Sequence, residues 1–89
     1  MMSEKEFTDM AAELRVAAVR SAAAAGIGVE GAEDVAQDIM LRLWTLRDNI
    51  SSARHARGLA VVAARNRALD MLRQSHTVSL TTGVAVVQP

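Results

Sequence analysis

The segment EDVAQDIMLRLWTLR, residues 33–47, carries the clearest helical pattern of the chain. Its apolar residues recur at steps of three and four, which places them on one face of a helix with 3.6 residues per turn. We expect this face to lie in the core, with the rest of the chain packed around it. The predicted core positions of this helix are Val35, Ala36, Ile39, Leu43 and Leu46.

The other side of this helix is not wholly polar. Leu41 and Trp44 lie beside Glu33, Asp34 and Gln37, away from the predicted core stripe. Exposed apolar residues grouped with acids and an amide indicate a surface for a partner. Met40 shares this side, and for Met40 a partner surface and packing under another helix stay equally open. For Leu41 and Trp44 we favour the partner.

Composition predicts one small, helical domain. The chain has 89 residues, and its only aromatic residues are Phe7 and Trp44. Alanine, valine, leucine and methionine must therefore fill the core, which favours closely packed helices. The sequence has no cysteine, no apolar run of the ~18 residues that a membrane span needs, and an acidic, polar start unlike a signal peptide. We expect a soluble, cytoplasmic protein.

The net charge of zero conceals an asymmetry between the two halves of the chain. Residues 1–50 hold five basic and nine acidic groups, a net charge of −4, and residues 51–89 hold five arginines against Asp70 alone, a net charge of +4. On a helical wheel, Arg54, Arg57 and Arg65 of this second half fall on one side, with Val61 and Ala68 between them. A basic helix of this kind is a candidate footprint for an anionic partner. A solvated face, or ion pairing with the acidic half, explains it equally well.

Three helices are expected, near residues 4–25, 32–48 and 53–74. Ser3 and Glu6 fit a capping box at the start of the first helix, and Gly26 and Gly28 can end it. Ser51 or Ser52 can cap the third. Residues 75–89 show no helical period and are interpreted as a tail or linker without stable structure of its own. The predicted fold class is all-α, with residues 1–74 as its helical domain.

The sequence offers no catalytic or metal-binding constellation. His55 and His76 are the only histidines, and neither has a ligand or catalytic partner at a useful spacing. The glycines form no phosphate-binding loop. We expect neither an enzyme nor a bound cofactor or metal.

Two segments resemble a known family. AEDVAQDIMLRLW, residues 32–44, is similar to the polymerase-binding helix of bacterial extracytoplasmic-function sigma factors. AARNRALDMLR, residues 63–73, is similar to the promoter-recognition helix that follows it. The resemblance covers about residues 7–74 and implies a three-helix bundle of the region two type. Residues 75–89 then correspond to the start of a linker towards a region four domain, which reads the upstream promoter element.

The resemblance implies partners and sites for transcription initiation. The expected partners are core RNA polymerase, bound at the clamp helices of its β′ subunit, the non-template strand of the minus-ten promoter element, and an anti-sigma factor. The loop at residues 48–54 matches the loop that receives a flipped base. The residues expected to bind polymerase are Asp34, Gln37, Leu41 and Trp44. The residues expected to bind DNA are Arg54, Arg57, Arg65, Asn66 and Arg73.

One departure from the family pattern concerns strand opening. The family often carries aromatic residues in the first half of the third helix, where this chain has Leu59 and Val61. Stacking of a base on an aromatic ring contributes roughly 1–3 kcal/mol, so this departure leaves the strength of strand opening undetermined and does not affect the expectation of polymerase binding. A second hypothesis also stands: a helical interaction module, sequestering or dimerising, whose basic face binds no DNA.

Overall fold

The computed structural model describes residues 2–84, and their side chains as far as residue 74. Three helices and a short 3₁₀ turn follow one another: α1 (Glu4–Ala24), α2 (Val29–Thr45), η1 (Arg47–Asn49) and α3 (Ala53–Val84). No strand occurs among the residues described. The predicted all-α fold is confirmed. Across this same part of the chain, no helix has the length and apolar character that crossing a membrane requires.

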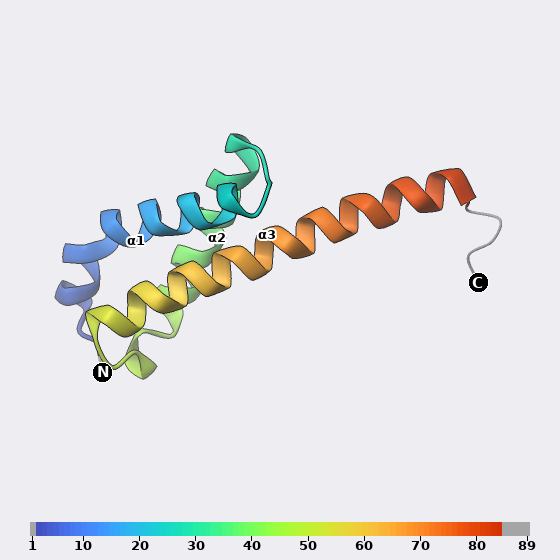
Figure 1. The fold of residues 1–89 in the computed structure, drawn as a ribbon. Helices are drawn as coiled ribbons and strands as arrows, with labels where there is room; N and C mark the ends of the chain where they lie inside the picture. Colours follow the sequence, from blue (N-terminus) through green and yellow to red (C-terminus); the bar gives the residue numbers. More distant parts are fainter. Residues whose placement is uncertain (1, 85–89) are drawn as a thin grey trace.

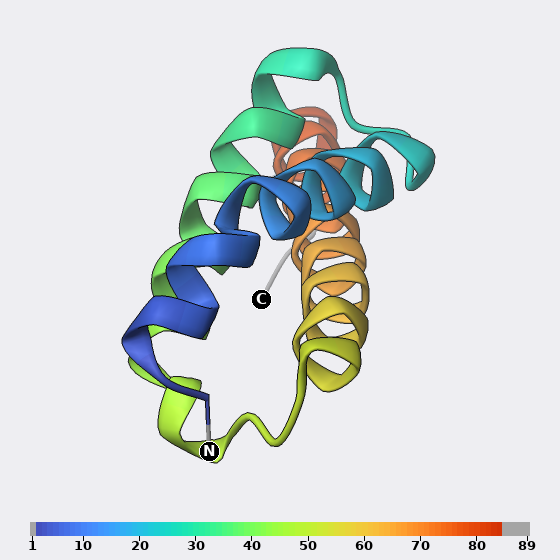
Figure 2. The same ribbon diagram turned by 90° about the vertical axis from the view of Figure 1, so that its left-hand side faces the viewer.

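The helices form a bundle around the first part of α3. α1 and α2 pack on this part of α3, and the remainder of α3 extends beyond them (Figure 1). Figure 2 shows α2 to the left of α3, while α1 crosses over α3 so that its C-terminal end lies on the other side. The start of the chain lies against the connection between α2 and α3, where the backbone N–H of Met2 donates to the carbonyl of Arg47 at 3.1 Å.

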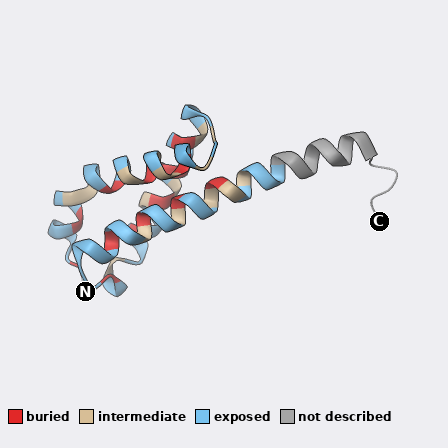
Figure 3. Cartoon of the chain, viewed as in Figure 1, coloured by how far each residue is buried: buried red, intermediate tan, exposed pale blue. Residues whose placement is uncertain are grey.

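The core is built largely from alanine. Buried residues line the surfaces where the helices face one another (Figure 3), and all buried side chains described are apolar. On α1 and α3 they follow steps of four residues, the ridges along which helices commonly pack. Small side chains on these ridges let the backbones approach closely. The residues of the ridges are Leu14, Ala18 and Ala22 on α1, and Ala56, Ala60, Ala64 and Ala68 on α3.

Most predicted core residues of α2 are confirmed, with one exception. Val35, Ala36, Ile39 and Leu43 are buried, whereas Leu46 is 49% exposed. α2 ends at Thr45, so Leu46 lies outside the regular helix and no longer shares its inner face.

The helical wheel also misplaces one residue of α3. It sets Ala68 among the arginines, yet Ala68 is fully buried. A ridge with a step of four drifts around the helix, and a straight stripe with a period of 3.6 does not follow it.

The helix ends follow local sequence signals. The capping box is confirmed, since the Ser3 hydroxyl accepts from the Glu6 N–H and the Glu6 carboxylate from the Ser3 N–H. Gly26, with φ of +110°, turns the chain after α1. α2 starts at Val29 rather than at residue 32, because Gly28 takes the extended N-cap conformation. Beyond Thr45 the predicted helical turn tightens into η1.

α3 is unbroken at Gly58, as expected, and continues past the predicted end at residue 74 to Val84. The sequence contains neither proline nor glycine between Gly58 and Gly83, so nothing interrupts the backbone hydrogen bonds of the helix. The first part of the predicted tail is therefore helical, and residues 85–89 of that tail lie outside the described residues.

Two glycine-to-alanine substitutions should change stability in opposite directions. Gly58→Ala adds a methyl group with no atom within 4 Å and raises helix propensity, so we expect a gain of up to about 1 kcal/mol in the free energy of unfolding. Gly26→Ala forces an L-residue to positive φ, so we expect a loss of about 1 kcal/mol or more. Denaturant unfolding followed by circular dichroism measures both. Destabilisation by Gly58→Ala would contradict a regular helix at that position.

Candidate functional site

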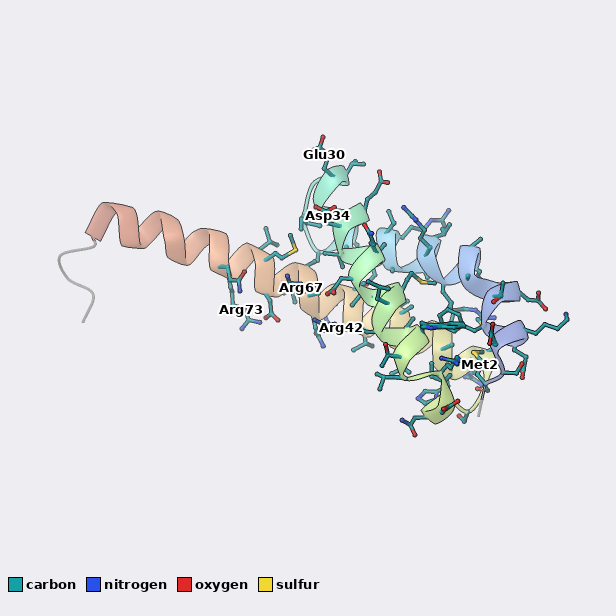
Figure 4. The ribbon with its side chains drawn as sticks, turned by 180° about the vertical axis from the view of Figure 1, so that it is seen from behind. Met2, Glu30, Asp34, Arg42, Arg67 and Arg73 are labelled. Carbon is teal, nitrogen blue, oxygen red and sulfur yellow. The ribbon has the colours of Figure 1, made fainter. Side chains whose placement is uncertain are left out.

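One exposed face of α2 carries four of the residues singled out from sequence. Asp34, Gln37, Leu41 and Trp44 are all exposed and succeed one another at steps of three and four residues. Leu41 is 63% exposed and Trp44 is 36% exposed. Figure 4 shows Asp34 near the start of α2. The structure therefore brings these residues onto a single surface, here called the α2 face.

Trp44 is held in place from two sides. The ring of Phe7 meets the indole edge-on, with centroids 5.4 Å apart and planes at 69°. The Arg47 guanidinium lies 4.0 Å from the indole centroid, and its Nη1 donates to the Trp44 carbonyl at 2.9 Å. Cation–π and edge-to-face contacts of this kind fix the orientation of a ring that remains partly exposed. Trp44 is thus a pre-oriented apolar anchor at one end of the α2 face.

The apolar surface of α2 is wider than the sequence indicated. Leu46, expected in the core, lines a shallow hollow of about 330 Å³ together with Leu41, Arg42 and Thr45. Met40, for which two interpretations were open, packs against the core as a partly buried residue. No periodic signal identifies Leu46 as a surface residue, because the helix ends just before it.

Asp38 of α2 contacts two arginines, one of which lies on α3. Its carboxylate lies 3.3 Å from Arg42 of the same helix and 3.7 Å from Arg67 of α3. Arg42 and Arg67 lie near each other on this side of the bundle, and Arg73 follows farther along α3 (Figure 4). These contacts are partly exposed and orient the two helices more than they stabilise the fold. No role for Arg67 was predicted from the sequence.

The connection before α3 is anchored at Ile50. This side chain is almost fully buried, while Ser51 and Ser52 beside it are exposed. The predicted cap is confirmed at Ser52, whose hydroxyl accepts from the His55 N–H at 3.1 Å. The Nδ1 of His55 accepts from the Ser51 N–H, also at 3.1 Å. Only residues 50–52 of the predicted loop at residues 48–54 lie outside η1 and α3, so the segment is a short, braced connection with exposed polar atoms.

The five residues predicted to bind DNA are all exposed on α3. Arg57 forms an ion pair with Glu13 of α1, and Arg73 lies 2.6 Å from Asp70 of the same helix. Within the described residues, Arg54 and Arg65 enter no ion pair. The basic half of the chain is thus partly neutralised by acids of both halves.

The part of the chain that the structure describes contains no group of three or more histidine, cysteine, aspartate or glutamate residues placed to hold an ion. What the arrangement offers is an apolar and acidic face on α2 and a basic, polar face on α3.

The comparisons with known proteins bear on these two faces. A family model described as Sigma-70 region 2 matches residues 18–77, which include all of α2 and much of α3. Neither the curated proteins nor the solved structures yield a match. The matched segment is more than half of the chain. The chain belongs to the sigma-70 region 2 family, a non-enzymatic transcription-factor domain that binds RNA polymerase and recognises promoter DNA in transcription initiation.

Proposed function

We propose that this domain is region two of a sigma factor of the extracytoplasmic-function type. In this proposal it docks on the clamp helices of the polymerase β′ subunit and binds the non-template strand of the minus-ten element, in the cytoplasm where the polymerase works. The observation that carries the proposal is the exposed α2 face, with Asp34, Gln37, Leu41 and Trp44 in one row. Family membership supports polymerase and promoter binding in general.

The chemistry of the α2 face suits a helical protein partner. Leu41 and Trp44 supply apolar contact area at one end, and Asp34 and Gln37 supply hydrogen-bonding groups at the other. Binding energy in protein interfaces concentrates in a few such anchors, with tryptophan strongly enriched among them. The hollow beside Leu41, which Leu46 also lines, gives a partner side chain a place to insert.

The chemistry of α3 and of the preceding loop suits a single DNA strand. Arg54, Arg57 and Arg65 are exposed donors for phosphates, and Asn66 is an exposed amide that can read a base edge. The short, braced connection before α3 presents polar atoms at the start of the same helix. Phosphate contacts position a strand, whereas the asparagine and the loop would select its sequence.

Two further elements belong to the proposal. Residues 75–89 lead towards a region four domain, so that residues 1–74 act as the region two unit. An anti-sigma factor would compete for the same surfaces, since a protein that covers the α2 face blocks polymerase.

The alternative is a helical interaction module without DNA binding. The pairs of Arg57 with Glu13 and of Arg67 with Asp38 favour this alternative, because acidic residues of the same domain neutralise these two arginines. Titration of the domain with single-stranded DNA separates the two functions.

Truncating the α2 face should weaken polymerase binding. Leu41→Ala and Trp44→Ala together should cost a few kcal/mol of binding free energy if these residues are anchors. Val62→Ala is a matched control, because Val62 is an exposed apolar residue on α3. Affinity for core polymerase, measured by surface plasmon resonance, tests this.

Folding must be followed alongside, because Trp44 also contacts Phe7. The single variant Leu41→Ala separates the effect on binding from an effect on folding, because Leu41 is mostly exposed. Unchanged polymerase affinity in a folded Leu41→Ala, Trp44→Ala variant would remove the α2 face from the interface.

Arginine and asparagine on α3 should differ in how their loss affects DNA binding. Arg57→Ala should flatten the salt dependence of single-strand affinity by about 0.7 in logarithmic slope, as expected for one lost phosphate contact. Asn66→Ala should leave that slope nearly unchanged and alter the preference among promoter sequences. Titrations of fluorescent oligonucleotides at several salt concentrations measure both quantities. Identical slopes and preferences in the parent and both variants would favour the interaction module.

A further inference from the structure

A shallow groove lies between α1 and α3, away from the α2 face. Its volume is about 500 Å³, within the range of roughly 300–1,000 Å³ typical of small-molecule sites. The C-terminal half of α1 runs beside the middle of α3 at this place (Figures 1 and 2). The groove is lined chiefly by small apolar residues and two arginines: Ala17, Ala24, Ala25, Val61, Arg20 and Arg65.

The two walls of the groove are tied together by a hydrogen bond. The Ser21 hydroxyl of α1 donates to the Val61 carbonyl of α3 at 2.6 Å. Alanine on α1 leaves the space above this bond unfilled, and Val61 adds an apolar wall that is 42% exposed. The groove therefore has an apolar lining whose two sides are fixed relative to each other.

The charge around the groove is positive. Arg20 and Arg65 both line it, and among the described residues neither forms an ion pair. No acidic residue lines it. Glu13 lines an adjoining hollow with Arg20, and its carboxylate is paired with Arg57. An occupant that combines an apolar body with negative charge would match this lining.

We propose that the groove receives one unstacked base of single-stranded DNA, with Arg20 and Arg65 on the adjacent phosphates. The inference rests on the proposed function and deepens it by assigning α1 a part in strand binding. A base has flat apolar faces and is flanked by anions, so it meets both requirements. Planar guanidinium groups also stack on bases, and here they stand beside Val61, where no aromatic ring is present.

Filling the groove tests the place of the base. Ala24→Leu puts a larger side chain into the groove, and Ala23→Leu, one position earlier and also exposed, is the matched control outside the lining. Both substitutions keep a strong helix former at the end of α1. The probes are an oligodeoxythymidylate and an abasic strand of equal length, titrated by fluorescence anisotropy.

The groove-filling variant should lower affinity for the base-bearing strand about five- to tenfold, at the lower end of the contribution of a stacked base. It should leave affinity for the abasic strand unchanged, and Ala23→Leu should change neither. Arg20→Gln should weaken binding of both strands and flatten the salt slope by about 0.7, whereas Lys5→Gln, an exposed change in the first turn of α1, should have a smaller effect.

Three outcomes would overturn the proposal. Equal binding of both strands by the parent, or equal behaviour of Ala24→Leu and Ala23→Leu, would show that no base enters the groove. If Ala24→Leu instead loses affinity only for an oligoglutamate peptide, titrated as a third probe, an acidic peptide is the occupant. If Arg57→Ala still weakens strand binding in these cases, the proposed function stands and only the groove assignment fails. If the parent binds no single strand, both fail.

Discussion

The bundle depends on close contact between alanine ridges. Ala60 and Ala64 of α3 are fully buried, as are Ala18 and Ala22 of α1. Alanine removes little apolar surface from water, so each contact contributes little by itself, and the gain comes from dispersion between closely spaced backbones. Such an interface leaves no room for larger side chains, and enlarging one of these alanines would cost on the order of 1–3 kcal/mol through overpacking.

Because alanine fills much of the core, many of the longer side chains lie at the surface. Leu41 and Trp44 are not needed to fill the interior, because Ile39 and Leu43 already cover the inner side of α2. The arginines of α3 likewise stand outside the alanine ridge. The domain can therefore present a protein-binding face on one helix and a basic face on another without either competing with folding.

The sequence predicted what depends on local pattern. The capping box of Ser3 and Glu6 and the inner face of α2 follow from residue spacing alone, and both are confirmed. The exposure of Leu46 depends on where α2 ends, and the burial of Ala68 on the angle at which helices cross. Neither is encoded in a single-helix period, so the wheel misplaced both.

For the candidate sites, residue spacing predicted which residues share one face of a helix. It could not predict which residues of other segments contact that face. That Asp34, Gln37, Leu41 and Trp44 lie on one side of α2 was predictable, because all four belong to one helix. The contacts of Trp44 with Phe7 and of Asp38 with Arg67 join segments far apart in the chain. The groove between α1 and α3 was not predictable for the same reason, because it forms only where the small residues of α1 lie beside Arg65 of α3.

The ion pairs that cross the domain bear on how its charge can be used. Glu13 with Arg57 and Asp38 with Arg67 neutralise part of the basic helix, which at first favours a purely structural role. Their side chains are between 37% and 53% exposed, and exposed pairs contribute only ~0–1 kcal/mol. A DNA strand offers a row of phosphates and gains from counterion release, so it can displace these carboxylates at little cost. The arginines in these internal pairs therefore remain available to an anionic partner.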